Sequence, residues 1–257
     1  MQQAKVIIAN TALLNALQLL VHQAGEAIMQ VYHTADFGIE TKKDDSPVTK
    51  ADLDAHYLLI DGLAKLTPNI AIVSEEDPAS QAVPQKHNCY WLIDPLDGTK
   101  EFINRNGQFT VNLALIENNI PSFGLVSTPI DQTLYWGGKH LGAWRLRDNT
   151  LEQLHIQTCH VPMRVVASNS HLNEATRDFI ASLGDTTLVQ AGSSLKLLRI
   201  AEGKADIYPR LAPTCEWDTA AAQAVLEGAG GKVTQVDGSP MKYGKTDMLN
   251  PHFVASS

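Results

Sequence analysis

The sequence predicts a mixed α/β (α+β) fold, with an antiparallel-rich N-terminal sheet and an α/β C-terminal half. Apolar residues near the N-terminus recur every three or four positions, which is the period of amphipathic helices. Residues 109–146 read as apolar strands broken by turn residues, the pattern of an antiparallel meander. From residue 164 onward, strand-like and helix-like segments alternate, as in α/β proteins. A chain of 257 residues with 44% hydrophobic content is long enough to bury such a core.

Two helices are expected first, at residues 11–32 and 51–66. The apolar side chains that fall on one face of the first are Leu13, Leu14, Leu17, Leu20, Val21, Ala24, Ile28 and Val31. The second helix follows Thr49, a residue type that caps helix N-termini. It ends before Pro68, which cannot continue a helix.

Strands are expected next, at residues 70–74 and 90–94, where short apolar runs occur. The segment between them, 77–88, is polar, contains Pro78 and Pro84, and has no apolar period. We therefore expect a surface excursion there. The strands of the meander are expected at 109–116, 121–127, 133–136 and 143–146.

The second half begins after a polar bridge at residues 147–160. Strands are expected at 164–167, 186–190 and 206–208, and helices at 173–183, 194–201 and 219–228. A boundary near 147–162 divides the chain into an N-terminal half, residues 1–150, and a C-terminal half, residues 151–257.

The composition restricts the class of partner and the compartment. The net charge is −8 and the chain has no Lys/Arg run, which argues against binding to a nucleic-acid polymer. Cys89, Cys159 and Cys215 are widely spaced and odd in number, which indicates a reducing compartment without structural disulfides. Polar residues such as Asn10 interrupt the apolar stretch 6–21, so we expect neither a transmembrane segment nor a signal peptide. A cytoplasmic location is expected.

The segment 94–99 (DPLDGT) places two carboxylates, a glycine and a hydroxyl directly after an apolar strand. Asp94 and Asp97 carry oxygen ligands of the kind that Mg²⁺ prefers. Gly98 and Thr99 can offer backbone N–H groups to a bound phosphate at the start of a helix. The same residues also fit an ordinary Asp/Gly turn in which Thr99 caps the helix.

Two other acidic clusters occupy similar positions. Glu75 follows the strand at 70–74, where its carboxylate can face the same crevice, because strand ends gather ligands. Glu76 and Asp77 read better as a solvated acidic turn. Asp218 begins a small-residue helix, a position that also fits a simple N-cap. Three acidic strand-end or helix-start positions in one chain favour a shared metal site over three separate caps.

Several motifs, taken in order, resemble those of the inositol monophosphatase superfamily over almost the whole chain. They are PVTKAD at 47–52, SEE at 74–76, DPLDGT at 94–99 and WDTAA at 217–221. Within that superfamily, three segments most closely resemble the bacterial 3′(2′),5′-bisphosphate nucleotidases of the CysQ type. They are DSPVT at 45–49, GSSLK at 192–196, and the segment 208–218.

The resemblance implies a layered αβαβα sugar-phosphatase fold. It also implies hydrolysis of the 3′-phosphate of adenosine 3′,5′-bisphosphate to AMP and phosphate by a metal-activated water, in sulfur assimilation or nucleotide recycling. The expected cofactor is Mg²⁺, as two or three ions, with sensitivity to lithium. Relatives of this type are placed in the cytoplasm or peripherally at the cytosolic face of the inner membrane, and a monomer or homodimer is expected.

The resemblance also implies roles for individual residues. The metal ligands are Glu75, Asp94, Asp97, Asp218 and the Leu96 carbonyl. Asp52 pairs with the Thr99 hydroxyl to orient the attacking water, and Glu75 assists in activating that water. The substrate-binding residues are Glu75, Leu96, Asp97, Gly98, Thr99, Ser193, Lys196 and Asp218.

Alternatives remain open at the level of residues and of function. Asp52 lies on a first helical turn, where a carboxylate also stabilises the helix dipole. Lys196 and Arg210 either approach an anionic substrate or are ordinary surface cations. The motifs shared by the superfamily also fit an inositol monophosphatase or a related sugar phosphatase. A non-catalytic protein that binds metal or nucleotide would require a damaged catalytic set, whereas every catalytic position is present.

Overall fold

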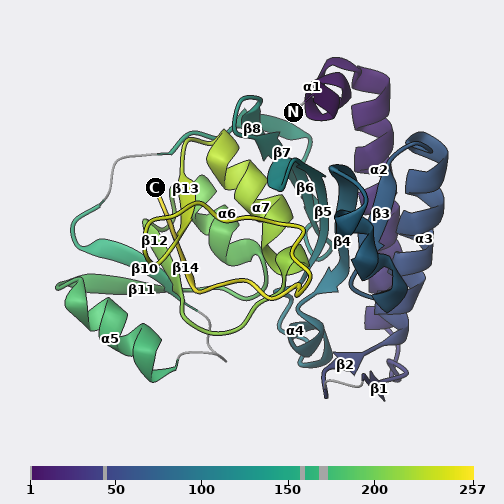
Figure 1. Cartoon of the computed structure of the whole chain (residues 1–257). Helices are drawn as coiled ribbons and strands as arrows, with labels where there is room; N and C mark the ends of the chain where they lie inside the picture. The colour runs from purple at the N-terminus through teal and green to yellow at the C-terminus, as the bar shows by residue number, and fades with distance from the viewer. Residues whose placement is uncertain (1, 43–44, 157–159, 168–172) are drawn as a thin grey trace.

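Helices and sheets alternate in five layers (Figure 1). The computed structural model describes residues 2–42, 45–156, 160–167 and 173–257. Helices α2 and α3 cover one face of a seven-stranded sheet, and α7 packs on its other face. Helix α6 lies beside α7 and against a five-stranded sheet, whose far side carries α5. This is the αβαβα order that the resemblance implies, so the predicted fold class is confirmed.

The five predicted helices are present, and all agree within one residue except the last, which begins at Glu216 and not at residue 219. The helices are α1 (Gln2–Ala9), α2 (Thr11–Tyr32), α3 (Lys50–Leu66), α4 (Thr99–Ile103), α5 (Glu174–Ser182), α6 (Leu195–Ala201) and α7 (Glu216–Gly228), with a 3₁₀ helix η1 (Pro78–Gln85). Helix α2 has the predicted bounds because Asn10 caps it, accepting from Leu13 N at 3.1 Å. Helix α1 was not predicted. The expected surface excursion contains η1, which Asp77 caps through Ala79 N at 3.1 Å.

The seven-stranded sheet has the strand order β3-β4-β5-β6-β7-β8-β9. Its strands are β3 (Ala71–Ser74), β4 (Cys89–Asp97), β5 (Thr110–Glu117), β6 (Ile120–Thr128), β7 (Thr133–Gly138), β8 (Gly142–Arg147) and β9 (Thr150–Gln153). Only β3 and β4 pair in parallel, so the predicted meander is confirmed. Strand β9 corrects the expected polar bridge, because its exposed residues extend the meander by one strand.

The five-stranded sheet has the order β11-β10-β12-β14-β13. Its strands are β10 (Met163–Ala167), β11 (Thr186–Gln190), β12 (Ile207–Arg210), β13 (Lys232–Gln235) and β14 (Phe253–Ser256). Strand β10 pairs in parallel with β11 and β12, whereas β14 runs antiparallel to β12 and β13. Strands β13 and β14 were not predicted. A two-stranded hairpin, β1 (Glu40–Thr41) and β2 (Pro47–Val48), completes the strands of the described residues.

Strands β4 to β7 of the seven-stranded sheet are buried, and their alternate residues point to opposite faces, so both faces carry a core. Trp91 and Ile93 of β4 join the core under α2 and α3, whereas Tyr90 and Leu92 join the core around α6 and α7. Helix α7 crosses this sheet so closely that a Cβ at Gly124 would lie 2.0 Å from Ala221 O. A residue other than glycine at position 124 would therefore push α7, and the site it carries, away from the sheet.

Within the described ranges, no single helix is both long and apolar enough to cross a membrane. Helices α1 and α2 pass that test only as a pair, and they are bent by 92°. No disulfide joins Cys89 and Cys215, and Cys159 lies outside the described residues.

Candidate active site

Three acidic side chains from separate elements meet at one end of the seven-stranded sheet. The parallel register pairs Ser74 with Ile93, so Glu75 and Asp94 follow on adjacent strands, and Glu75 N donates to Ile93 O at 3.2 Å. Asp218 comes from the first turn of α7. One carboxylate oxygen each from Glu75, Asp94 and Asp218 lies within 4.8 Å of the other two. The structure thus gathers three of the predicted metal ligands.

The electrostatics of these carboxylates favour protonation or the binding of a cation. Burial, followed by the charges of Glu75 and Asp97, raises the pKa of Asp94 well above its usual value. Burial and the same two neighbours raise the pKa of Asp218. Buried like charges at this distance must hold protons or a cation. An all-oxygen set of this kind fits Mg²⁺ or another hard divalent ion.

Asp97 faces a different set of partners. A shift of register in β4 between Asp94 and Asp97 separates the two side chains along the strand. The Oδ2 atom of Asp97 accepts hydrogen bonds from Ser193 Oγ at 2.6 Å, Ser194 N at 2.7 Å and Asn112 Nδ2 at 3.2 Å. Asp97 therefore links the end of β4 to the start of α6.

Asp52 and Thr99 contact each other, as the resemblance implies. Asp52 Oδ2 accepts from Thr49 N at 2.7 Å and Thr49 Oγ1 at 2.6 Å, which caps α3, while its Oδ1 accepts from Thr99 Oγ1 at 3.0 Å. Asp52 is thus both a capping residue and a partner of Thr99. Burial raises the pKa of Asp52, although hydrogen bonds from Thr49 and Thr99 oppose the shift.

The tight turn before α4 depends on glycine. Gly98, and not Thr99, is the N-cap residue of α4, and its φ of 96° is a conformation that residues with a Cβ rarely adopt. A Cβ at this position would also lie 3.1 Å from Gln108 O. The Leu96 carbonyl lies in the same turn, 3.4 Å from Thr99 Oγ1.

A cavity of ≈ 470 Å³ opens beside these residues, and its lining comes from residues 46–101 and 193–219. The predicted site residues that line it are Glu75, Asp97, Gly98, Thr99, Ser193, Lys196 and Asp218. Arg210 also lines the cavity, and its buried Nε atom has no hydrogen-bond partner in the described part of the chain. Burial lowers the pKa of Lys196 to about 8, although Asp97 opposes the shift. Lys196 is 8% exposed, so it is not an ordinary surface cation.

Lys42 is a site residue that the sequence analysis missed. Its Nζ lies 2.8 Å from Glu75 Oε1 and 2.7 Å from Glu76 Oε1. Burial lowers the pKa of Lys42, but the charges and hydrogen bonds of these two glutamates outweigh burial and raise it above its usual value. The Glu76 side chain is only 5% exposed, so the expectation of a solvated acidic residue was wrong at this position.

Thr110 and Asn112 were also missed, although the sequence contains a signal for them. They occupy alternate positions of a strand that is otherwise apolar up to Ile116, so both point to the face on which Asp94 lies, and Asn112 is the register partner of Asp94. Both side chains are almost completely buried. Two polar residues at a spacing of two in a buried strand indicate a polar site on that face.

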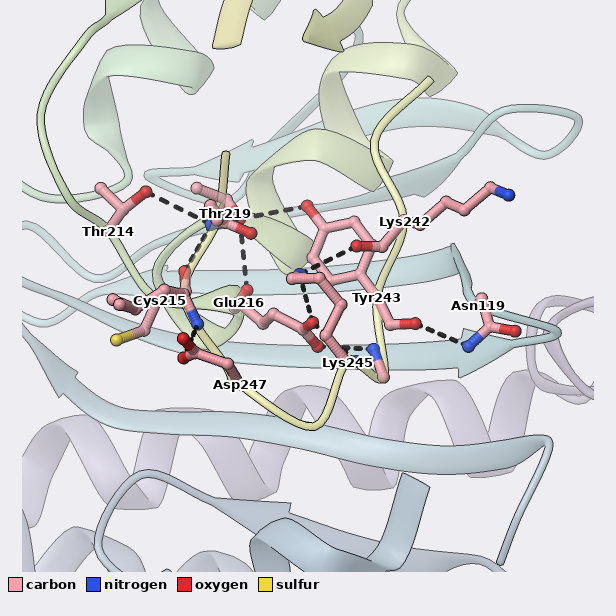
Figure 2. Close-up of polar contacts among 12 residues, drawn as sticks. Asn119, Thr214, Cys215, Glu216, Thr219, Lys242, Tyr243, Lys245 and Asp247 are labelled. Carbon is pink, nitrogen blue, oxygen red and sulfur yellow. Dashed lines mark hydrogen bonds and ion pairs between the residues drawn. The ribbon is translucent and has the colours of Figure 1, made fainter. Parts of the chain in front are cut away.

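The C-terminal segment contacts the start of α7 through Glu216, which faces Lys245 (Figure 2). The buried carboxylate of Glu216 accepts from Gly244 N at 2.7 Å and Lys245 N at 3.1 Å, and it also pairs with the Lys245 ammonium. Asp218 Oδ2 accepts from Cys215 N at 2.8 Å. The predicted N-cap role of Asp218 is therefore close to the observed one: Asp218 lies in the first turn and bonds back to the N-cap residue, Cys215.

Comparison with known proteins shows similarity over nearly the entire chain. The model of the inositol monophosphatase family matches residues 9–257. The 3′(2′),5′-bisphosphate nucleotidase CysQ of Escherichia coli (strain K12) is 44% identical over 239 residues, which are 92% of this chain and 96% of that protein. The corresponding protein of Haemophilus influenzae is 35% identical over 250 residues, 95% of this chain and 93% of that one.

Solved structures agree with these sequence matches. CysQ from Bacteroides thetaiotaomicron, described as a bacterial member of the inositol monophosphatase family, superposes with a TM-score of 0.83 at 38% identity. That match covers 95% of this chain and 97% of the other. The inositol monophosphatase TM1415 of Thermotoga maritima has the same fold, with a TM-score of 0.77 at 23% identity, over 95% of this chain and 91% of its own.

Proposed function

The chain belongs to the inositol monophosphatase family, and from this premise we propose that it is a Mg²⁺-dependent phosphatase that converts adenosine 3′,5′-bisphosphate to AMP and phosphate. The observation that carries the proposal is the group formed by Glu75, Asp94 and Asp218, whose oxygens lie within 4.8 Å of one another beside the cavity. The similarity to named bisphosphate nucleotidases supports this choice of substrate.

The metal would be held by Glu75, Asp94 and Asp218, with Asp97 and the Leu96 carbonyl as further ligands and two or three ions in all. Mg²⁺ supplies charge stabilisation for the attacking and leaving oxygens and lowers the pKa of water. Gly98 and Thr99, at the start of α4, are proposed to donate backbone N–H groups to the phosphate.

The pair formed by Asp52 and Thr99 orients the nucleophile. Because Thr99 Oγ1 donates its proton to Asp52 Oδ1, its lone pairs are left to accept a proton from water in the cavity. That water attacks phosphorus as the P–O3′ bond breaks; it gives one proton to the pair formed by Thr99 and Asp52, and the ribose 3′-oxygen takes up one proton from solvent in the cavity. Glu75 lies beside the same cavity and is proposed to assist this proton transfer.

Lys196 and Arg210 favour a substrate with a second phosphate. Both line the cavity, and both carry a feature that a bound anion would satisfy. The buried Lys196 ammonium has a lowered pKa, of about 8, and Arg210 Nε is buried without a partner among the described residues. The second phosphate of the nucleotide is proposed to bind here.

The test is phosphate release from a panel of substrates, with and without Mg²⁺ and with added Li⁺. Adenosine 3′,5′-bisphosphate should be the best substrate, Mg²⁺ should be required, Li⁺ should inhibit, and Asp94→Asn should be inactive. Equal or faster turnover of inositol 1-phosphate would refute the proposed substrate but not the chemistry. Tight nucleotide binding without phosphate release would refute the chemistry as well.

The proposed reaction belongs to sulfur assimilation or nucleotide recycling. A cytoplasmic location, with or without peripheral contact at the inner membrane, stays a prediction that cell fractionation would test. A monomer or homodimer is likewise a prediction, which light scattering would test.

A further inference from the structure

Asp97 uses its two carboxylate oxygens in different ways. Its Oδ2 atom accepts from Ser193 Oγ, Ser194 N and Asn112 Nδ2, at 2.6, 2.7 and 3.2 Å. No hydrogen bond between described residues reaches Oδ1. An oxygen with three donors has little capacity left for a metal, whereas the other oxygen keeps all of its capacity.

A second row of groups lies behind these donors. The Thr110 hydroxyl oxygen is 2.7 Å from Ser193 Oγ and 2.8 Å from Ser194 Oγ. Ser194 Oγ also lies 3.0 Å from Asn112 Oδ1. Ser194 is 3% exposed, and Thr110 and Asn112 are at most 1% exposed, so water does not replace these contacts.

The number of hydroxyl protons restricts the direction of the hydrogen bonds in this network. Each hydroxyl has one proton, and Ser193 donates its own to the Asp97 carboxylate. A hydrogen bond between Thr110 and Ser193 therefore uses the Thr110 proton, for which Asn112 Oδ1, 3.1 Å from Thr110 Oγ1, is a second acceptor. Ser194 then donates to Asn112 Oδ1 or to Thr110. Hydrogen bonds that point in series toward an anion strengthen one another.

Ser193 adopts a backbone conformation that supports this interpretation. Its φ is 51°, in the left-handed region that residues with a Cβ rarely adopt. Such strain costs roughly 1 kcal/mol or more and persists only where the surroundings enforce it. The strained turn places two donors, Ser193 Oγ and Ser194 N, within hydrogen-bonding distance of one oxygen of Asp97, and these bonds offset the strain.

We propose that Thr110, Asn112, Ser193 and Ser194 are positioning residues, here called the Asp97 clamp. They saturate Oδ2 and leave Oδ1 available to the metal that the proposed function requires. The clamp spans both halves of the chain, since Asp97, Thr110 and Asn112 come from the seven-stranded sheet and the two serines precede α6. In this arrangement the Ser193 hydroxyl serves Asp97 and not the substrate.

The first test removes the hydroxyl of Thr110, because Ser193 and Ser194 line the cavity and Thr110 does not. Thr110→Val preserves shape. Calorimetric titration with Mg²⁺ alone should show binding weakened about fivefold, the size of one lost hydrogen bond. Thr133→Val is the matched control, because Thr133 is equally buried in the same sheet and its hydroxyl has no partner among the described residues. The control should bind Mg²⁺ like the wild type.

The second test separates positioning from stability and from substrate binding. Ser193→Gly removes the hydroxyl but relieves the strained φ, so the melting temperature should not fall, while Mg²⁺ binding should weaken about tenfold. Unchanged Mg²⁺ binding in both variants would overturn the proposal. A raised KM for the nucleotide with unchanged Mg²⁺ binding in Ser193→Gly would also overturn it, by assigning Ser193 to the substrate. Absence of Mg²⁺ binding to the wild type would instead refute the proposed function.

Discussion

Replacing Asp94 with asparagine should stabilise the Mg²⁺-free protein while abolishing its activity. Asp94 is 1% exposed and belongs to the group of carboxylates whose oxygens lie within 4.8 Å of one another. Its Oδ1 accepts from Leu96 N at 3.1 Å, a hydrogen bond that the asparagine amide oxygen can also accept. The substitution therefore removes a charge with little change in shape or hydrogen bonding.

The magnitude follows from the separation of the charges. Two like charges 4.8 Å apart repel by about 3.5 kcal/mol at an effective dielectric constant of about 20. Asp94 has two such neighbours, Glu75 and Asp218. The free energy lost to this repulsion has an upper limit, because the cluster can instead bind a proton. Protonating one carboxyl at pH 7.5 requires about 5 kcal/mol. The two repulsions together exceed this protonation cost, so the wild type should carry a proton in the cluster, and we expect Asp94→Asn to gain at most about 5 kcal/mol, or about 10–20 °C in melting temperature.

The sign of the pH dependence follows from the raised pKa values of Asp94 and Asp218. A carboxyl whose pKa is higher in the folded state favours folding when it is protonated. That stability is present below the unfolded pKa, about 4, and is lost as the pH rises through the higher folded pKa. The Mg²⁺-free wild type should therefore have a lower melting temperature at pH 8 than at pH 5. The melting temperature of Asp94→Asn should fall less over the same pH range.

The assay is calorimetric melting in EDTA and in saturating Mg²⁺, from pH 5 to pH 8, with phosphate release measured in parallel. Glu202→Gln is the contrasting control, because hydrogen bonds from Arg199 and Arg145 outweigh burial and lower the pKa of Glu202 to about 2. That variant should lose about 2 kcal/mol with or without Mg²⁺, since its charge is paired. A lower melting temperature for Asp94→Asn in EDTA would refute the reasoning.

Three other variants test separate parts of the site. Asp52→Asn and Thr99→Val should each lower kcat by about 10²–10⁴-fold with little change in KM, because the nucleophile is no longer oriented. Steady-state phosphate release would measure both constants. A large rise in KM with unchanged kcat would contradict that role. Lys196→Met should raise KM about tenfold for adenosine 3′,5′-bisphosphate but not for adenosine 3′-phosphate, because one charged contact to the second phosphate is lost. Equal effects on both substrates would exclude that contact. Glu216→Gln should lower the melting temperature by about 4–8 °C, the equivalent of about 2 kcal/mol. The reason is that it replaces a buried carboxylate that accepts hydrogen bonds from residues 244 and 245. No change by calorimetry would mean that other contacts hold the C-terminal segment.

The elements that were predicted correctly are those whose signal is local. Helix α2 carries its own apolar period and N-cap, so its bounds could be predicted as observed. Strands β5 to β8 alternate with strong turn signals. Strand β9 was missed because all of its residues are exposed, so the apolar alternation that marks a strand is absent. Helix α1 was taken for part of an apolar stretch, although α1 and α2 are separate helices bent by 92°.

The carboxylates of the candidate site were recognisable because they follow apolar strands or begin a helix within compact motifs. Their convergence was an inference from the resemblance and from the tendency of strand ends to gather ligands. The structure places Glu75, Asp94 and Asp218 together and brings Thr99 to Asp52.

The amino-acid sequence was enough to predict which side chains lie at the strand ends and helix starts, and with them the class of chemistry. Three features depend on how the chain packs: the saturation of one Asp97 oxygen, the pairing of Lys42 with Glu75 and Glu76, and the lining of the cavity from distant segments. They could not be predicted because of separation along the chain: the bond from Ser193 to Asp97 joins residues 96 positions apart. Such contacts depend on how sheets and helices pack, and no local pattern of residues encodes them.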